Sequence, residues 1–223
     1  MGVQIIFPNG NLWAGKEEAR NPGQVCLMPQ GGNSYRYSGY TGTIAAALAA
    51  NSEVLQFRFL AGTKTYALIE RIEFEGMGIV AVPTAAGPLG FEAVPARAWT
   101  AAGSGGTRIN PASNTLKLET PLNTSQVSDL GIATTGALTA GTKTLDTNAI
   151  GGVLGGVGTA AVTVYGGTSI ITPGMLFERY QNGDMPLVLA NQEGFVIRTT
   201  HAGPATMTYA ARFGISWREV AAF

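Results

Sequence analysis

The chain contains few ionisable side chains. Only 13% of its 223 residues are Asp, Glu, Lys or Arg, and the formal net charge is zero, whereas about 25% charged residues is usual in globular domains. A soluble monomer ordinarily carries more charge, because charge keeps protein surfaces apart. Two interpretations stay open: Thr, Ser, Asn and Gly supply the surface polarity, or partners in an assembly cover much of the surface.

The basic residues form no cluster. Ten arginines and four lysines are scattered along the chain without a basic run. Proteins that bind nucleic acid neutralise phosphates with clustered Lys and Arg. We therefore expect no nucleic-acid partner.

The side chains that usually carry catalysis or hold metals are scarce. There is one cysteine, Cys26, which excludes an intramolecular disulfide, and one histidine, His201, in a predicted surface turn. Zinc sites need three or four Cys, His or carboxylate ligands. The glycine-rich nucleotide motifs and the nucleophile-elbow motif are also missing. We expect no enzymatic activity, no cofactor and no metal site.

Long hydrophobic runs are missing as well. The longest apolar run, residues 44–50, cannot span a bilayer. The first residues, MGVQII, lack the basic segment and the long apolar stretch of a signal peptide. We expect no membrane partner and synthesis in a cytoplasm. Residues 44–50 suit either a short helix or a strand end followed by a loop.

Alternation of apolar and polar residues is the strongest pattern present. Met207, Tyr209, Phe213, Ile215 and Trp217 share one parity, and the opposite parity contains Thr, Arg, Gly and Ser. Side chains of a strand alternate between its two faces, so this pattern predicts a long strand with one buried face. A helix would distribute these aromatic residues around its circumference.

Two further pairs of predicted strands flank short turns. Residues 54–60 place Leu55, Phe57 and Phe59 inward and Gln56 outward, and they precede a second apolar run at 66–75. Residues 61–64 between these runs suit a hairpin connection. Residues 187–189 and 195–197 are joined through 191–194, in which Gly194 could supply a positive φ.

Three carboxylates lie close together in the run at 66–75. Glu73 and Glu75 share a predicted face with Arg71, which is typical of a solvated surface. Glu70 falls on the apolar parity. We expect it either to pair with an arginine or to lie exposed at the rim of the sheet.

The chain contains 31 glycines and 11 prolines, which separate short runs of alternating apolar residues. This pattern is typical of an all-β sandwich or barrel. We expect an antiparallel, jelly-roll-like β-sandwich at residues 34–223, with long loops rich in Gly, Thr and Ala. An extended N-terminal arm covers residues 1–33, and a loop-rich excursion covers about 120–175. Both are either surfaces that lie on a neighbouring protein or ordinary long loops.

Several stretches resemble small virion structural proteins of tailed bacteriophages. They are residues 42–59 (GTIAAALAANSEVLQFRF), 140–146 (AGTKTLD), 186–198 (PLVLANQEGFVIR), 205–206 (AT) and 217–220 (WREV), about a fifth of the chain. The resemblance implies a virion component with a β-sandwich fold and contains no catalytic motif. It does not indicate a position in the virion.

Capsid decoration, or cement, is the role that we expect. Such a protein would bind across subunits of the major capsid protein at the capsid surface, as a homotrimer. A tail, baseplate or head-fibre component is the alternative. A carbohydrate-binding sandwich is a third reading, suggested by Trp99 near the loop of residues 104–106.

One cluster of residues has the composition of a protein interface. Tyr35, Arg36, Tyr37 and Tyr40 follow the predicted arm, and Trp13 lies within it. Tyr, Trp and Arg are the residues that most often anchor interfaces. The alternative is a strand whose aromatic side chains fill the core.

If the arm is adhesive, deleting residues 1–33 should leave a folded sandwich that no longer binds capsid shells. Circular dichroism would report folding, and co-sedimentation with shells would report binding. Loss of folding on deletion would contradict the assignment of this segment as an arm.

Overall fold

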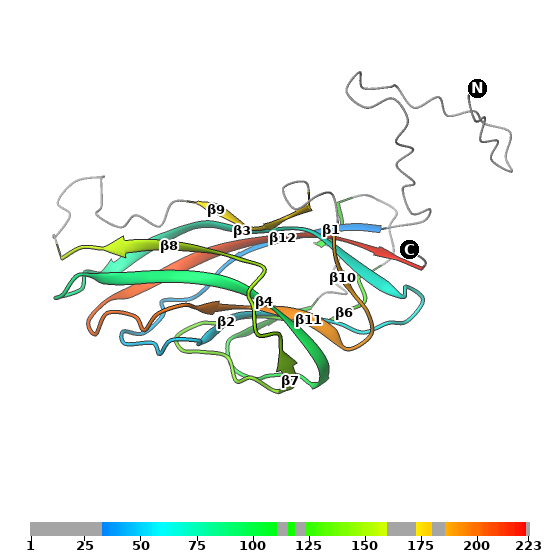
Figure 1. Cartoon of the computed structure of the whole chain (residues 1–223), viewed down its shortest axis with the longest axis horizontal. Coiled ribbons are helices and arrows are strands. Elements are labelled where there is room, and N and C mark those ends of the chain that lie inside the picture. Colours follow the sequence, from blue (N-terminus) through cyan, green and yellow to red (C-terminus); the bar gives the residue numbers. More distant parts are fainter. Residues whose placement is uncertain (1–32, 111–115, 119–123, 160–172, 180–185, 222–223) are drawn as a thin grey trace, which may run out of the picture.

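The protein is an all-β sandwich of two antiparallel sheets (Figure 1). The computed structural model describes residues 33–110, 116–118, 124–159, 173–179 and 186–221. Trp13, Cys26 and the predicted arm up to residue 32 lie outside these residues. The prediction of an all-β sandwich is confirmed.

Each sheet takes strands from both halves of the chain. The five-stranded sheet contains β1 (Asn33–Tyr40), β12 (Thr208–Val220), β3 (Tyr66–Ala81), β10 (Leu187–Leu189) and β9 (Gly174–Glu178). The seven-stranded sheet contains β5 (Thr107–Ile109), β6 (Val127–Ile132), β2 (Glu53–Phe59), β11 (Glu193–Thr199), β4 (Gly87–Ala101), β7 (Thr142–Leu145) and β8 (Gly151–Val157).

Strand pairing is nested, as expected for a jelly roll. The first strand pairs with the last, β1 with β12, and β2 pairs with β11, while β3 pairs with β10. This arrangement is that of a long hairpin rolled into two sheets. Its consequence is that chain neighbours often lie in opposite sheets.

Both predicted hairpins are therefore wrong. Residues 61–64 carry the chain from β2 to β3, and residues 190–192 carry it from β10 to β11, each time into the other sheet. The positive φ in the second connection belongs to Gln192, at 61°, rather than to Gly194. Gly194 serves another purpose, because a Cβ there would collide with the carbonyl oxygen of Phe57 on β2.

The alternation predicted for β12 is confirmed. Met207, Tyr209, Phe213, Ile215 and Trp217 are all buried in the core. Four aromatic contacts connect the two sheets: Phe57 with Trp217 (5.1 Å), Phe91 with Phe213 (5.3 Å), Phe74 with Phe91 (5.4 Å) and Phe91 with Tyr209 (6.1 Å). These contacts form an aromatic layer between the sheets, within a core whose other members are mostly aliphatic.

A β-bulge changes the parity of β3. Its register against β12 shifts between Ile69 and Arg71, which leaves Glu70 without a directly opposite residue. Ile69 consequently faces the core together with Ile72, although their positions differ by an odd number of residues. Glu70 pairs with Arg218 at 3.5 Å and with Arg179 at 3.9 Å, which confirms one of its two predicted environments.

The described part of the predicted excursion at 120–175, residues 124–159 and 173–175, belongs largely to the sandwich. It contributes β6, β7, β8 and the start of β9 to the two sheets. Its glycine content hid these strands, since glycine has no side chain to show alternation. At Gly151 the missing side chain allows β8 to lie against the carbonyl of Leu176 on β9, which brings the two sheets together at this edge. Residues 44–50 form no helix, and they contain only a bridge at Ile44 and turns.

The outer face of the seven-stranded sheet has a small core of its own. Val94, Ala96, Trp99 and Val196 are buried there, and Leu145 and Ala149 pack against them. Part of the segment of residues 133–150 lies over this face, where Leu145 and Ala149 pack on the cluster and the Thr139 carbonyl accepts a hydrogen bond from Gln56. Gln56, predicted to point outward, does so but is buried beneath this segment.

Replacing Trp217 by alanine tests the aromatic layer. Its side chain is fully buried between Tyr35 and Phe57, so Trp217→Ala should lower the free energy of unfolding by about 3–5 kcal/mol. Urea unfolding followed by circular dichroism would measure this. A loss under about 1 kcal/mol, typical of surface substitutions, would show the packing to be wrong.

Candidate interaction surface

The structure separates the five residues that were predicted to form an interface. Tyr35 and Tyr37 are only 0% and 7% exposed, so their assignment as surface anchors is wrong: they belong to the inward parity of β1. Arg36 and Tyr40 have the outward parity, and Tyr40 is 62% exposed. Trp13 lies outside the described residues.

Burial also changes the acidity of the two inward tyrosines. It raises the pKa of the Tyr37 hydroxyl to about 12. It likewise raises the pKa of Tyr35, against a side-chain hydrogen bond from Asn33 that lowers it. Burial thus strengthens the preference of both side chains for the neutral phenol, in agreement with their core positions.

The outer face of β1, β12 and β3 carries a network of charged side chains. Its members are Arg36, Arg71, Glu73, Glu75 and Arg212, and we call this set the outer charged network. Glu73 pairs with Arg71 at 2.5 Å and with Arg36 at 3.5 Å. Glu75 pairs with Arg212 at 2.6 Å and with Arg36 at 3.2 Å. Each carboxylate is thus held by two guanidinium groups.

The network crosses three strands because the middle one has a glycine. Arg36 extends from β1 over β12 to reach Glu75 on β3. Gly214 on β12 lies directly below this ion pair, and a Cβ there would collide with the Glu75 carboxylate. The glycine therefore provides the space in which the side chains from the two flanking strands meet.

The exposed surface of the outer charged network consists mainly of arginine rather than glutamate side chains. The side chains of Arg36, Arg71 and Arg212 are 37%, 40% and 42% exposed, whereas those of Glu73 and Glu75 are 12% and 16% exposed. Three cations against two anions also leave the network with a formal charge of +1. A partner with an acidic patch would complement this face.

Tyr40 extends the network at one end. The Arg212 guanidinium lies 4.8 Å from the centre of its ring and donates a hydrogen bond to its hydroxyl at 2.9 Å. Ser38 connects the same groups, because it accepts a hydrogen bond from Arg212 at 3.0 Å and donates one to Glu75 at 2.8 Å. The exposed ring is thereby held in a fixed orientation.

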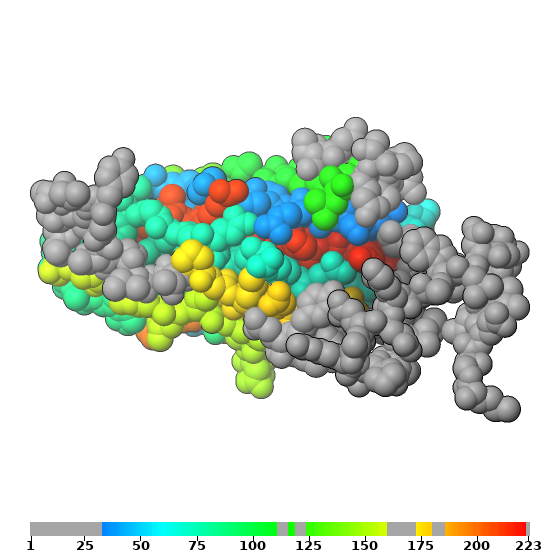
Figure 2. Space-filling view, turned by 90° about the horizontal axis from the view of Figure 1, so that it is seen from above, coloured from blue at the N-terminus to red at the C-terminus, as the bar shows by residue number. Residues whose placement is uncertain are grey.

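Seen from outside, this face is formed by β1, β12 and β3 side by side, with β9 along one border (Figure 2). Between β3 and β9 lies a hollow of about 470 Å³ lined by Arg71, Glu73, Glu75, Met175 and the adjoining backbone. Arg71 also donates to the sulfur of Met175 at 3.3 Å. The hollow continues the outer charged network towards β9.

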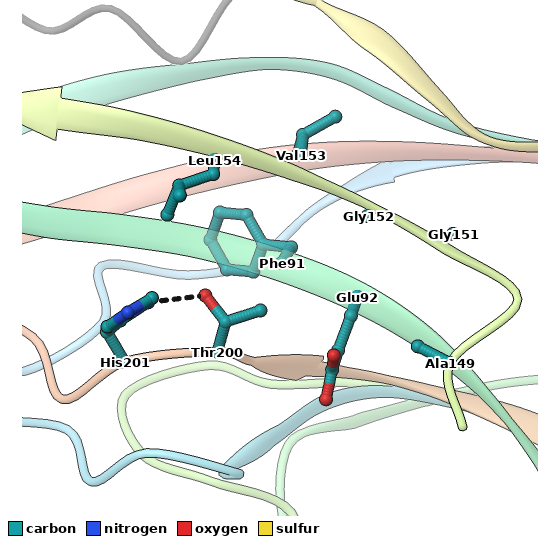
Figure 3. A pocket seen from close by; sticks show the side chains of 9 residues that line it. All are labelled: Phe91, Glu92, Ala149, Gly151, Gly152, Val153, Leu154, Thr200 and His201. Atoms are coloured by element: carbon teal, nitrogen blue, oxygen red, sulfur yellow. Dashed lines mark hydrogen bonds between the residues drawn. The ribbon is translucent and has the colours of Figure 1, made fainter.

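A second hollow, of about 310 Å³, lies between β4, β8 and the turn at residue 201 (Figure 3). Thr200 Oγ1 is 2.8 Å from His201 Nδ1 there. The carboxylate that lines this hollow, Glu92, pairs instead with Arg198 at 2.6 Å. The site therefore does not provide the carboxylate-oriented histidine of acyl-transfer chemistry.

The structure also bears on the suggested sugar-binding role of Trp99. Trp99 is fully buried, so its suggested role in sugar binding is wrong, because a sugar platform needs an exposed ring.

Within the described ranges, no group of three His, Cys, Asp or Glu side chains is placed to hold a metal ion. The same part of the chain contains no helix of the length and hydropathy needed to cross a membrane.

Comparison of the chain with protein-family models, with curated proteins and with solved structures found no match.

The outer charged network should contribute little to folding. Arg212→Ala removes contacts to Glu75, Ser38 and Tyr40, but Glu75 keeps Arg36. Since these groups are partly solvated, we expect the free energy of unfolding to fall by no more than about 1 kcal/mol. Urea unfolding of the variant would measure it. A loss above about 3 kcal/mol would make the network a structural element rather than a surface one.

Proposed function

We propose that this protein is a structural component of a tailed-phage virion, a decoration or cement protein. It binds across subunits of the major capsid protein at the capsid surface, and it acts as a homotrimer. The contact surface is the outer face of the five-stranded sheet, centred on the outer charged network and Tyr40. Its action is binding rather than turnover of a substrate.

One observation carries the choice of this face. In a chain so poor in charge, five charged side chains and an exposed tyrosine are fixed against one another on adjacent strands. Arg and Tyr are enriched among the residues that dominate interface energies. Side chains that are ordered before binding lose less conformational entropy when a partner covers them.

The fold supports a role in resisting force. β1 and β12 pair over eight residues, from Asn33 opposite Glu219 to Tyr40 opposite Arg212. Both are at the proposed contact face, so a pull on this face is distributed over the full ladder between the first and last strands. Repetition of even weak contacts over a capsid lattice strengthens attachment through avidity.

Imaging distinguishes the proposal from its alternative. Purified protein would be mixed with undecorated shells, and the particles would be examined by electron cryo-microscopy. Density at regular positions over the whole lattice is expected. Density confined to the tail, baseplate or isolated vertices would instead support the tail, baseplate or head-fibre role, and absence of the protein from every particle would contradict both.

Substitution of the proposed contact residues should weaken binding without unfolding the protein. We expect Tyr40→Ala and Arg212→Ala each to reduce affinity for shells by about tenfold or more, as loss of an anchoring Tyr or Arg does. The matched control is His201→Ala, which alters an exposed side chain outside the five-stranded sheet. Co-sedimentation over a range of concentrations would measure the affinities. Equal binding by all three variants would exclude this face.

A further inference from the structure

A lysine, a glutamate and a glutamine meet beneath the segment that covers the seven-stranded sheet. The side chains of Lys143 and Glu53 are 2% and 7% exposed, and Gln56 is fully buried. Lysine is rarely buried to this extent. The desolvation of such an ion pair can outweigh its Coulomb attraction, so stability alone is a weak reason for its presence.

A single carboxylate oxygen holds both nitrogens. Glu53 Oε2 lies 2.9 Å from the Lys143 amine and 2.5 Å from the amide nitrogen of Gln56. The Glu53 carboxylate therefore bridges the Lys143 amine and the Gln56 amide. A carboxylate in this position can take a proton from one nitrogen and deliver it to the other.

The Gln56 amide is fixed and polarised. Its nitrogen also donates to the Thr139 carbonyl at 2.8 Å, and its oxygen accepts a hydrogen bond from Arg108 at 3.2 Å. Asp129 holds the same Arg108 guanidinium nitrogen at 2.8 Å. A cation on the amide oxygen stabilises the negative charge that develops there when a nucleophile adds to the carbonyl.

The surroundings of the three side chains limit access of water. The Lys143 amine lies 4.5 Å from the ring centre of Trp99, which is fully buried. The backbone of Gly103 passes close above the amide, where a Cβ would come within 2.6 Å of Gln56 Oε1. Exclusion of water strengthens the electrostatic contacts and protects an acyl group from hydrolysis.

We propose that Lys143 and Gln56 form an intramolecular amide cross-link. Glu53 takes a proton from the lysine ammonium, and the free amine attacks Cδ of Gln56, with Arg108 stabilising the oxygen. Glu53 then passes its proton to Nε2 of Gln56 and takes one of the two protons left on Nζ, so that the product amide keeps the other. The Cδ–Nε2 bond breaks, the Cδ–Nζ bond remains, and ammonia leaves. No oxidant, reductant or added group takes part.

Gln56 rather than Glu53 is the acyl donor. An ionised carboxylate repels a nucleophile, whereas the Gln56 carbonyl is neutral and polarised by Arg108. The product is also better suited to a buried site: an ion pair is replaced by a neutral amide and a protonated carboxyl group, which removes the cost of burying two charges.

The cross-link would join β2 to β7 and so fasten the covering segment to the sheet. Residues between the two partners would form a closed covalent loop, which restricts the unfolded chain and thereby stabilises the fold. This inference concerns contacts within one chain and does not depend on capsid binding.

Intact mass measurement of the purified full-length protein under denaturing conditions tests it. After allowance for the state of the N-terminus, the mass should be about 17 Da below that of the sequence, because aminolysis of the amide releases one ammonia. Protease digestion should yield one peptide that contains Lys143 joined to one that contains Gln56. A wild-type mass equal to that of the sequence in folded protein would overturn the proposal.

Variants assign the roles. Lys143→Arg keeps the positive charge and should show the full sequence mass, as should Glu53→Gln, while Lys64→Arg, the matched control, should keep the loss of ammonia. Circular dichroism would establish that each variant is folded. A cross-link that persists in Glu53→Gln, or a loss of water with Lys143 joined to Glu53, would overturn the mechanism.

Discussion

Contact between aromatic side chains of opposite sheets holds this fold together. Trp217 on β12 meets Phe57 on β2 edge-on, at an interplanar angle of 80°, and Phe213 meets Phe91 on β4 in the same manner, at 84°. Edge-to-face pairs of this kind contribute beyond the area that they bury. β12 supplies both Trp217 and Phe213. The register of β12 within its sheet therefore decides how the two sheets are aligned, and which side chains remain on the two outer faces.

Those outer faces are treated differently. On the seven-stranded sheet, Leu145 and Ala149 pack over the cluster that contains Trp99, and the nearby side chains of Glu53, Gln56 and Lys143 are buried and bonded to one another. On the five-stranded sheet, Arg36 and Arg212 remain partly exposed over their carboxylates. One face is thus closed by the chain itself, and the other presents an ordered polar surface. This difference underlies both the proposed contact with a capsid and the proposed cross-link.

Because the chain has few charged residues, the positions of these residues are informative. Many of the described charged side chains form pairs or networks that connect strands, as Arg97 does between Asp146 and Glu193. Exposed pairs contribute little to stability, whereas burial of the Glu53–Lys143 pair costs desolvation energy and so suggests a role other than stability. We therefore explain the outer charged network by recognition of a partner and the buried Glu53–Lys143 pair by covalent chemistry.

The sequence by itself determined the strands with strict alternation. β12 and the inward set Leu55, Phe57 and Phe59 of β2 could be predicted, because a two-residue period fixes which side chains share a face. The all-β class follows from the same periodicity. Of the candidate interface residues, Arg36 and Tyr40 lie on the outer face, whereas Tyr35 and Tyr37 are buried, since enrichment in tyrosine fits a core strand as well as an interface.

Only the tertiary structure decided the rest. The bulge at Glu70 depends on the partner strand and leaves no mark in the local pattern. The glycine-rich strand β8 has too few side chains to alternate, and its place is set by the approach of β9 at Gly151. Arg36 meets Glu75, and Lys143 meets Glu53 and Gln56, across strands that are distant in sequence. Both sites arise from the rolled topology, because it pairs β1 with β12 in one sheet and places β2 and β7 in the other.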